Sequence, residues 1–166
     1  AKSIYADFSS LTVSLYEKLR KQFHIEDAST ILYEKRMVKR RDEIANIAKA
    51  TQIAKKIINS VDFSRCKTEM DVKKYLLRET LEQGFESAFE PIVATDKNSS
   101  YPHYRAANVK LGSIVLVDYG VKYKNYCSDL TRCFFLKKDK KTNDMKSNYE
   151  KIKGIFQELT DNFPDF

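Results

Sequence analysis

Several residue types and patterns are scarce in this chain of 166 residues, and each scarcity argues against a class of protein. With 4 glycines and 3 prolines, the sequence is neither loop-dominated nor repetitive. No apolar run approaches the ~20 residues of a membrane-spanning helix, so we expect no membrane contact. No signal peptide is recognisable at the N-terminus. The 3 cysteines are widely spaced, which argues against a disulfide framework or a zinc knuckle and favours a cytoplasmic location.

The abundant residues predict a packed core and a basic surface. Hydrophobic residues make up 42% of the chain, including 10 Tyr and 10 Phe. The 30 Lys and Arg exceed the 23 Asp and Glu, which gives a net charge of +7. The basic residues concentrate at positions 35–41 and 137–141, where no aromatic residues alternate with them as a stacking platform for nucleic acid requires. We interpret these clusters as solvated surface and expect no nucleic-acid partner.

Hydrophobic periodicity and capping residues predict an α+β fold, with helices followed by a mostly antiparallel sheet. We expect helices over residues 9–23, 39–61, 68–84 and 145–159, and strands over residues 2–6, 30–33, 85–93, 113–120 and 121–136. Thr68 and Asp71 form a variant of the capping box, and Gly84 ends the helix that they begin. Residues 95–108 are expected to form a polar loop.

The two strand-like runs on either side of residues 124–125 predict a β-hairpin with a two-residue turn. Counting from this turn, Asp118 pairs with Thr131, and Gly120 pairs with Asp129. Because opposed residues share a face and side chains alternate, the two aspartates lie on one face as diagonal neighbours. Their Cα atoms would be ~7–8 Å apart, a separation at which two carboxylates can hold a divalent ion.

The same residues allow a structural interpretation. Asp118 could be a strand-end residue bonded to backbone amides, and Asp129 could pair with Arg132 or another cation. Cys127 lies on the same predicted face, either as a ligand or, as we favour, as a packed thiol.

Two histidines complete the set of candidates. His103 follows Pro102 in the predicted polar loop and is the one candidate for catalysis, whereas His24 is expected on the surface. The spacing does not pair either histidine with a particular serine or cysteine nucleophile.

Five segments together carry a resemblance to a known family. They are Phe89–Ala94 (FEPIVA), Asn98, Pro102-His103, Val115–Gly120 (VLVDYG) and Ser128–Arg132 (SDLTR). In these segments the chain resembles the pita-bread (creatinase/aminopeptidase) metallopeptidases, which include proline dipeptidase, aminopeptidase P and methionine aminopeptidase. The FEPIVA segment is most similar to the branch that acts on proline peptides. The resemblance covers essentially the whole chain.

The resemblance implies a domain organisation. Residues 1–34 would be the end of a separate, creatinase-N-like N-terminal domain. Residues 35–166 would be the first half of the pita-bread catalytic domain, truncated at the C-terminus. The missing C-terminal half would then be a partner of this chain, and the full-length protein would be a homodimer.

The resemblance also implies roles for three residues. Asp118 and Asp129 would be ligands of a centre of two divalent ions, manganese or cobalt and possibly zinc, with Asp129 bridging both ions. His103 would help to stabilise the tetrahedral intermediate during hydrolysis of an X-Pro bond.

A full centre in this family has five ligands, and the sequence supplies two of them. The family takes a histidine and two glutamates from the second half of its fold. We therefore expect the full-length parent to be an X-Pro peptidase and this chain alone to be inactive, with exposed apolar surface. The alternative is a pita-bread interaction module that has lost its metals.

Overall fold

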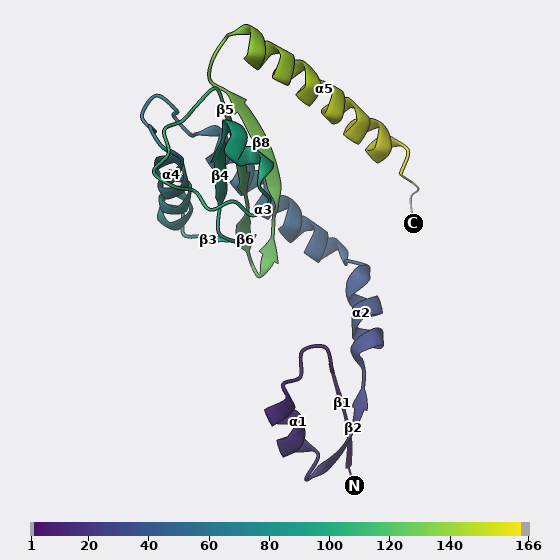
Figure 1. The fold of residues 1–166 in the computed structure, drawn as a ribbon. Helices are drawn as coiled ribbons and strands as arrows, with labels where there is room; N and C mark the ends of the chain where they lie inside the picture. The colour runs from purple at the N-terminus through teal and green to yellow at the C-terminus, as the bar shows by residue number, and fades with distance from the viewer. Residues whose placement is uncertain (1, 164–166) are drawn as a thin grey trace. The chain divides into compact units, whose positions relative to one another are not determined.

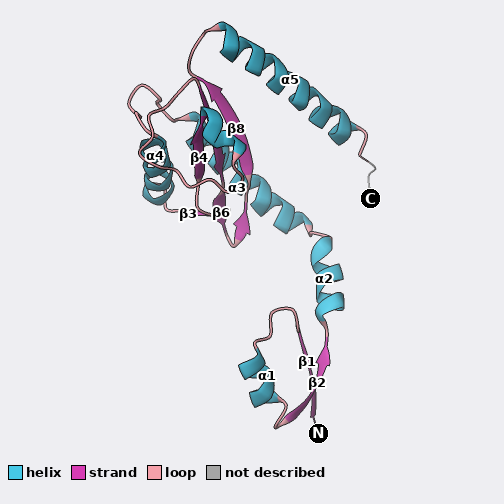
Figure 2. Cartoon of the chain, viewed as in Figure 1, coloured by secondary structure: helices cyan, strands magenta, loops and turns pink. Residues whose placement is uncertain are grey.

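A computed structural model describes residues 2–163, which belong to two compact units (Figures 1 and 2). The units comprise residues 1–44 and 45–166 and are described separately below. Among the described residues, no helix is long and apolar enough to span a membrane. The assignment of residues 1–34 to a separate N-terminal domain stays a prediction.

The first unit contains a β-α-β arrangement. Strand β1 (Lys2–Ala6) pairs in parallel with β2 (Phe23–Asp27), and α1 (Val13–Leu19) connects them. The predicted strand at residues 2–6 is confirmed, but the predicted helix over residues 9–23 is too long at both ends. Thr12 caps α1 by accepting a hydrogen bond from the backbone of Leu15, and Phe23 already belongs to β2.

The predicted strand at residues 30–33 is wrong, because this segment belongs to helix α2 (Ser29–Met37). Asp27 starts the helix by accepting hydrogen bonds from the backbone and hydroxyl of Ser29. Residues 32–37 are mostly good helix formers, which outweigh the β-branched Thr30 and Ile31.

Two helices of the second unit supply much of its core. Helix α3 (Arg41–Asn59) is amphipathic and buries Ala54, Ile57 and Ile58, which the apolar spacing predicts, together with Ala50 and Ile53; Ile44, near its start, is exposed. Helix α4 (Glu69–Glu82) begins with the capping box predicted at Thr68, and Gly84 follows its end with a φ of 77°.

Strands of the second unit form two antiparallel sheets of three strands each. One contains β4 (Ile92–Thr95), β5 (Ile114–Tyr119) and β8 (Leu130–Phe135), in that order. The other contains β3 (Glu86–Ser87), β6 (Val121–Tyr123) and β7 (Tyr126–Cys127). The single strand predicted at residues 85–93 is therefore two strands. Pro91, which has no N–H to donate, lies in the break between them.

The core lies between one face of the β4-β5-β8 sheet and helices α3 and α4 (Figure 1). It contains apolar side chains of both helices and of β4 and β5, among them Ile57, Leu76, Val93, Val117 and Tyr119. Tyr119 is fully buried, and its hydroxyl lies 2.5 Å from the Thr80 hydroxyl of α4. The opposite face of β5 carries Asp118, which is only partly covered.

Helix α5 (Lys140–Asp161) is longer than the predicted helix at residues 145–159. Asp139 caps it by accepting a hydrogen bond from the backbone of Thr142, a start signal that the apolar spacing does not show. Tyr149 packs edge-on against Phe135 of β8. Much of the remaining apolar face is exposed, including Phe156 at 68%, as expected for a chain with uncovered apolar surface.

Candidate functional site

The predicted hairpin register is confirmed by the two ladders that flank the aspartates. Asp118 pairs with Thr131 in the β5-β8 ladder, and Lys122 pairs with Cys127 in the β6-β7 ladder. Both pairs fit one count from the turn at residues 124–125, so no residue is inserted between the ladders. Asp118 and Asp129 therefore share a face of the hairpin.

Gly120 lies between the two ladders and allows the backbones to approach closely. A Cβ atom at this position would lie 1.9 Å from the backbone oxygen of Ser128. Ser128 is buried, and its backbone N–H donates to the oxygen of Val121 at 2.9 Å. The close approach at Gly120 holds the backbone that precedes Asp129 against the strand that carries Asp118.

Asp118 has an electrostatic environment that disfavours its charged form. Burial and the negative charge of Asp129 raise the pKa of Asp118, while a hydrogen bond from Thr131 and the nearby His103 oppose the increase. Its Oδ1 is buried without a hydrogen-bond partner among residues 2–163. The structural interpretation predicts that backbone amides donate hydrogen bonds to Asp118, but Oδ1 accepts none from the described residues. Arg132, the suggested partner of Asp129, donates to the Thr131 oxygen instead.

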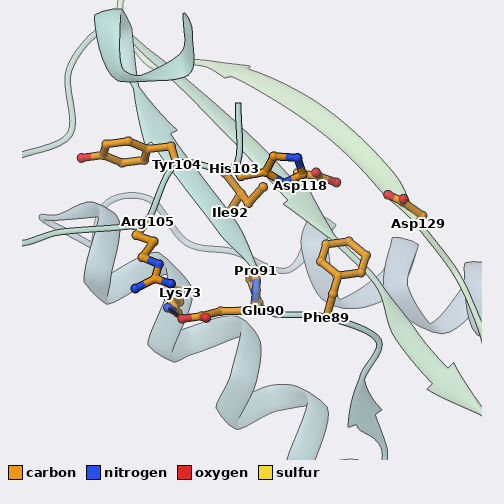
Figure 3. A pocket seen from close by; sticks show the side chains of 10 residues that line it. All are labelled: Lys73, Phe89, Glu90, Pro91, Ile92, His103, Tyr104, Arg105, Asp118 and Asp129. Atoms are coloured by element: carbon orange, nitrogen blue, oxygen red, sulfur yellow. Dashed lines mark hydrogen bonds and ion pairs between the residues drawn. The ribbon is translucent and has the colours of Figure 1, made fainter. Parts of the chain in front are cut away.

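Of the three remaining candidates, His103, His24 and Cys127, His103 is the one that lies beside Asp118 (Figure 3). His103 is exposed, has a φ of 54°, and lies beside Asp118 (Figure 3). His24 is exposed in β2 of the first unit, as predicted. Cys127 is exposed, so its interpretation as a packed thiol is wrong.

A pocket of about 370 Å³ brings Asp118, Asp129 and His103 together (Figure 3). Its other lining residues are Lys73, Phe89, Glu90, Pro91, Ile92, Tyr104 and Arg105. The two aspartates lie on one side, and the basic side chains lie on the other (Figure 3). On the basic side Lys73 forms an ion pair with Glu90. The hydrogen bond from Lys73 and its positive charge lower the pKa of Glu90, and the charge of Arg105 lowers it further.

Sequence reasoning missed a buried carboxylate that bonds to Tyr104, a lining residue of this pocket. Glu69, at the start of α4, is 0% exposed. Its Oε1 accepts hydrogen bonds from the backbone of Thr95 at 2.8 Å and from Asn98 Nδ2 at 2.9 Å. Its Oε2 accepts from the Tyr104 hydroxyl at 2.9 Å and from the backbone of Ala107 at 3.2 Å. All four donors are distant in sequence, so no local pattern indicates them.

The donor set at Asp118 and Asp129 fits part of a site for a divalent ion. Two carboxylates converge, and one buried carboxylate oxygen accepts no hydrogen bond from the described residues. A bound cation would offset both the repulsion between the carboxylates and the missing hydrogen bond. Within the described part of the chain, no three His, Cys, Asp or Glu side chains gather as a metal site. The two aspartates alone leave the coordination of a metal incomplete.

Comparison with known proteins identifies the family. The model of metallopeptidase family M24 matches residues 45–163. The chain belongs to this family. It is 32% identical over 149 residues to an uncharacterized peptidase of Methanocaldococcus jannaschii, covering 86% of the chain and 41% of the relative. It is 30% identical over 134 residues to an Xaa-Pro dipeptidase of Pyrococcus horikoshii, covering 75% and 38%.

Solved structures show the same relationship. An Xaa-Pro dipeptidase from Bacillus anthracis superposes with a TM-score of 0.76 at 26% identity, over 86% of this chain and 42% of that chain. The chain thus has the mixed helix-and-strand fold of M24 peptidases, which confirms the predicted pita-bread class. It spans about two fifths of the length of these relatives.

Proposed function

We propose that this chain is part of an enzyme that hydrolyses X-Pro peptide bonds, with its reaction centre at the pocket around Asp118. The observation that carries the proposal is the convergence of Asp118 and Asp129 on a pocket that His103 also lines. The similarity to Xaa-Pro dipeptidases of Pyrococcus horikoshii and Bacillus anthracis supports X-Pro peptides as the substrate class.

Each residue of the site has a proposed role. Asp118 and Asp129 would hold divalent ions, and Oδ1 of Asp118, buried without a hydrogen-bond partner among the described residues, is an atom that a cation would stabilise. Two such ions, manganese or cobalt and alternatively zinc, supply an activated water and a polarised scissile carbonyl when bound. His103 lies beside Asp118, where its ring can donate a hydrogen bond to the substrate oxygen that becomes charged.

The rest of the pocket suits a proline-containing peptide. Phe89, Pro91 and Ile92 offer an apolar wall to a pyrrolidine ring, and Tyr104 also lines the pocket. These contacts orient a substrate without taking part in proton transfer.

We further propose that the chain alone is inactive. Two carboxylates are too few for tight binding of catalytic ions, because affinity rises with ligand number and geometry. The remaining ligands would come from a polypeptide equivalent to the rest of the catalytic domain of its relatives. We also propose a homodimer and a cytoplasmic location for the full protein; the free thiols at Cys66, Cys127 and Cys133 suit a reducing compartment.

Reconstitution tests this proposal. The chain is mixed with a separately produced polypeptide that corresponds to the rest of the catalytic domain, and hydrolysis of the dipeptide Ala-Pro is followed with Mn²⁺ or Co²⁺. We expect activity from the mixture and none from either polypeptide alone. Cleavage by the 166-residue chain by itself would contradict the proposed inactivity.

Matched variants assign the activity to the site. Asp129→Asn should lower the reconstituted activity at least ~100-fold, since even loss of an outer partner of a metal ligand costs ~10–100-fold. Asp144→Asn, an exposed change on α5, serves as the control and should leave the activity unchanged. A folded complex that cleaves no X-Pro dipeptide with Mn²⁺, Co²⁺ or, in a further assay, Zn²⁺ would refute the proposed function.

A further inference from the structure

We propose that Glu69 is a positioning residue whose buried carboxylate fixes the loop that carries His103 at the pocket. The functional meaning of this proposal rests on the role proposed above for His103. The structural part stands independently, on four hydrogen bonds that converge on one side chain.

The first argument is the cost of burying this group. Glu69 is fully enclosed, and burying a carboxylate is unfavourable unless strong donors compensate. Here each carboxylate oxygen accepts two hydrogen bonds, which accounts for the compensation. A side chain that only began a helix would face solvent, as most acidic residues in a first helical turn do.

The second argument is where the donors come from. They lie at the end of β4, in the short 3-10 helix at residues 96–100, and in the segment at residues 104–107. His103 lies between the last two of these segments. Glu69 therefore ties both ends of the short stretch that contains His103 to the start of α4.

The third argument concerns the backbone at His103. A φ of 54° is unusual for a residue other than glycine and persists only where neighbouring structure holds it. The next residue, Tyr104, is held at its hydroxyl, which donates to Glu69 and accepts from Asn98 Nδ2 at 2.9 Å. Burial and the bond to Glu69 also raise the pKa of Tyr104, in keeping with its hydroxyl acting as a donor to Glu69.

Both oxygens of Glu69 must act as acceptors in this arrangement. Both donors to Oε1 are N–H groups, and an N–H group and a hydroxyl donate to Oε2. In Glu69→Gln, an amide NH₂ would oppose at least one backbone N–H whichever way the amide is turned. Glu69 does not line the pocket, so its effect on His103 acts through the loop.

Histidine-ring NMR signals of the 166-residue chain test the proposal, because the chain has only His24 and His103. The ring Cε1–Hε1 signals are compared between the wild type, Glu69→Gln and Asn98→Ala. We expect the His103 signal to move by more than its line width in both variants. The His24 signal, which reports on the first unit, should stay in place.

A matched control comes from the same helix. Glu82→Gln removes an exposed carboxylate of α4 and should move neither histidine signal. If Glu69→Gln does not fold, Asn98→Ala decides the question, because it leaves Glu69 with three of its donors. A folded variant with unshifted core methyl signals and an unshifted His103 signal would overturn the proposal. None of these readouts depends on peptidase activity, so failure of the proposed function would be seen separately.

Discussion

The environment of Asp118 leads to a prediction whose sign depends on metal. In a chelator at neutral pH, Asp118→Asn should make the folded chain more stable than the wild type. With excess Mn²⁺, the wild type should gain stability and the variant should gain little. The reason is that burial and the charge of Asp129 penalise the ionised carboxyl of Asp118, and a bound cation relieves that penalty.

The pH dependence follows from the direction of the pKa shift. A carboxyl whose pKa is raised in the folded state binds its proton more tightly when folded than when unfolded. Its contribution favours folding most at low pH and is lost as the pH rises through the raised pKa. The advantage of Asp118→Asn should therefore be absent near pH 3, below the ordinary pKa of 3.8, and should grow with pH.

The size of the effect can be bounded from Coulomb's law at a representative separation. Two unit charges ~4 Å apart repel by about 4 kcal/mol at an effective dielectric constant of ~20 and by about 1 kcal/mol in water. Asp129 is exposed and Asp118 is partly covered, so we expect ~1–2 kcal/mol, or roughly 2–8 °C in Tm. Manganese at about ten times its Kd would stabilise the wild type by ~1.4 kcal/mol.

Thermal unfolding followed by circular dichroism, in EDTA and in increasing MnCl₂ between pH 3 and 8, measures both effects. Asp144→Asn is the control for loss of an exposed carboxylate, and its Tm should follow that of the wild type. If Asp118→Asn lowers the Tm in EDTA at neutral pH, the charge is stabilised in the folded chain and the electrostatic reasoning is wrong. An equal response of wild type and variant to Mn²⁺ would remove Asp118 from the metal site.

Four further substitutions test the fold by urea unfolding. Thr68→Ala removes the side-chain half of the capping box and should cost ~1 kcal/mol. Tyr119→Phe removes the buried hydrogen bond between the hydroxyls of Tyr119 and Thr80. Thr80 still donates to the backbone oxygen of Leu76, so the change should also cost ~1 kcal/mol. Gly120→Ala places a Cβ atom 1.9 Å from a backbone oxygen and should cost ~3 kcal/mol, the upper end of the usual overpacking range. Gly154→Ala, in open space on α5, should instead stabilise the helix by up to ~1 kcal/mol.

The hairpin was predictable from the sequence because its determinants are local. A two-residue turn sets the register, and alternation then assigns each side chain to a face. Asp118 and Asp129 could therefore be placed together from the spacing alone. The capping box at Thr68 was predictable for the same reason, since both partners lie within one helical turn.

The sequence was less informative where tertiary contacts decide the structure. Helical spacing continues through Phe23, but parallel pairing with β1 places that residue in a strand. The role of Glu69 was hidden because its donors lie 26 to 38 residues away. A glutamate after a capping threonine looks like an ordinary member of a first helical turn.

The four hydrogen bonds to Glu69 have a consequence for local opening of the chain. Backbone amides in loops usually exchange with solvent quickly, because small fluctuations expose them. The amides of Thr95, at the end of β4, and of Ala107, in the following loop, instead donate to the fully buried carboxylate of Glu69 at the start of α4, so solvent reaches them only when that region opens. They should therefore exchange hydrogen for deuterium as slowly as the central strand β5. The loop that carries His103 would then open only together with the core of its unit.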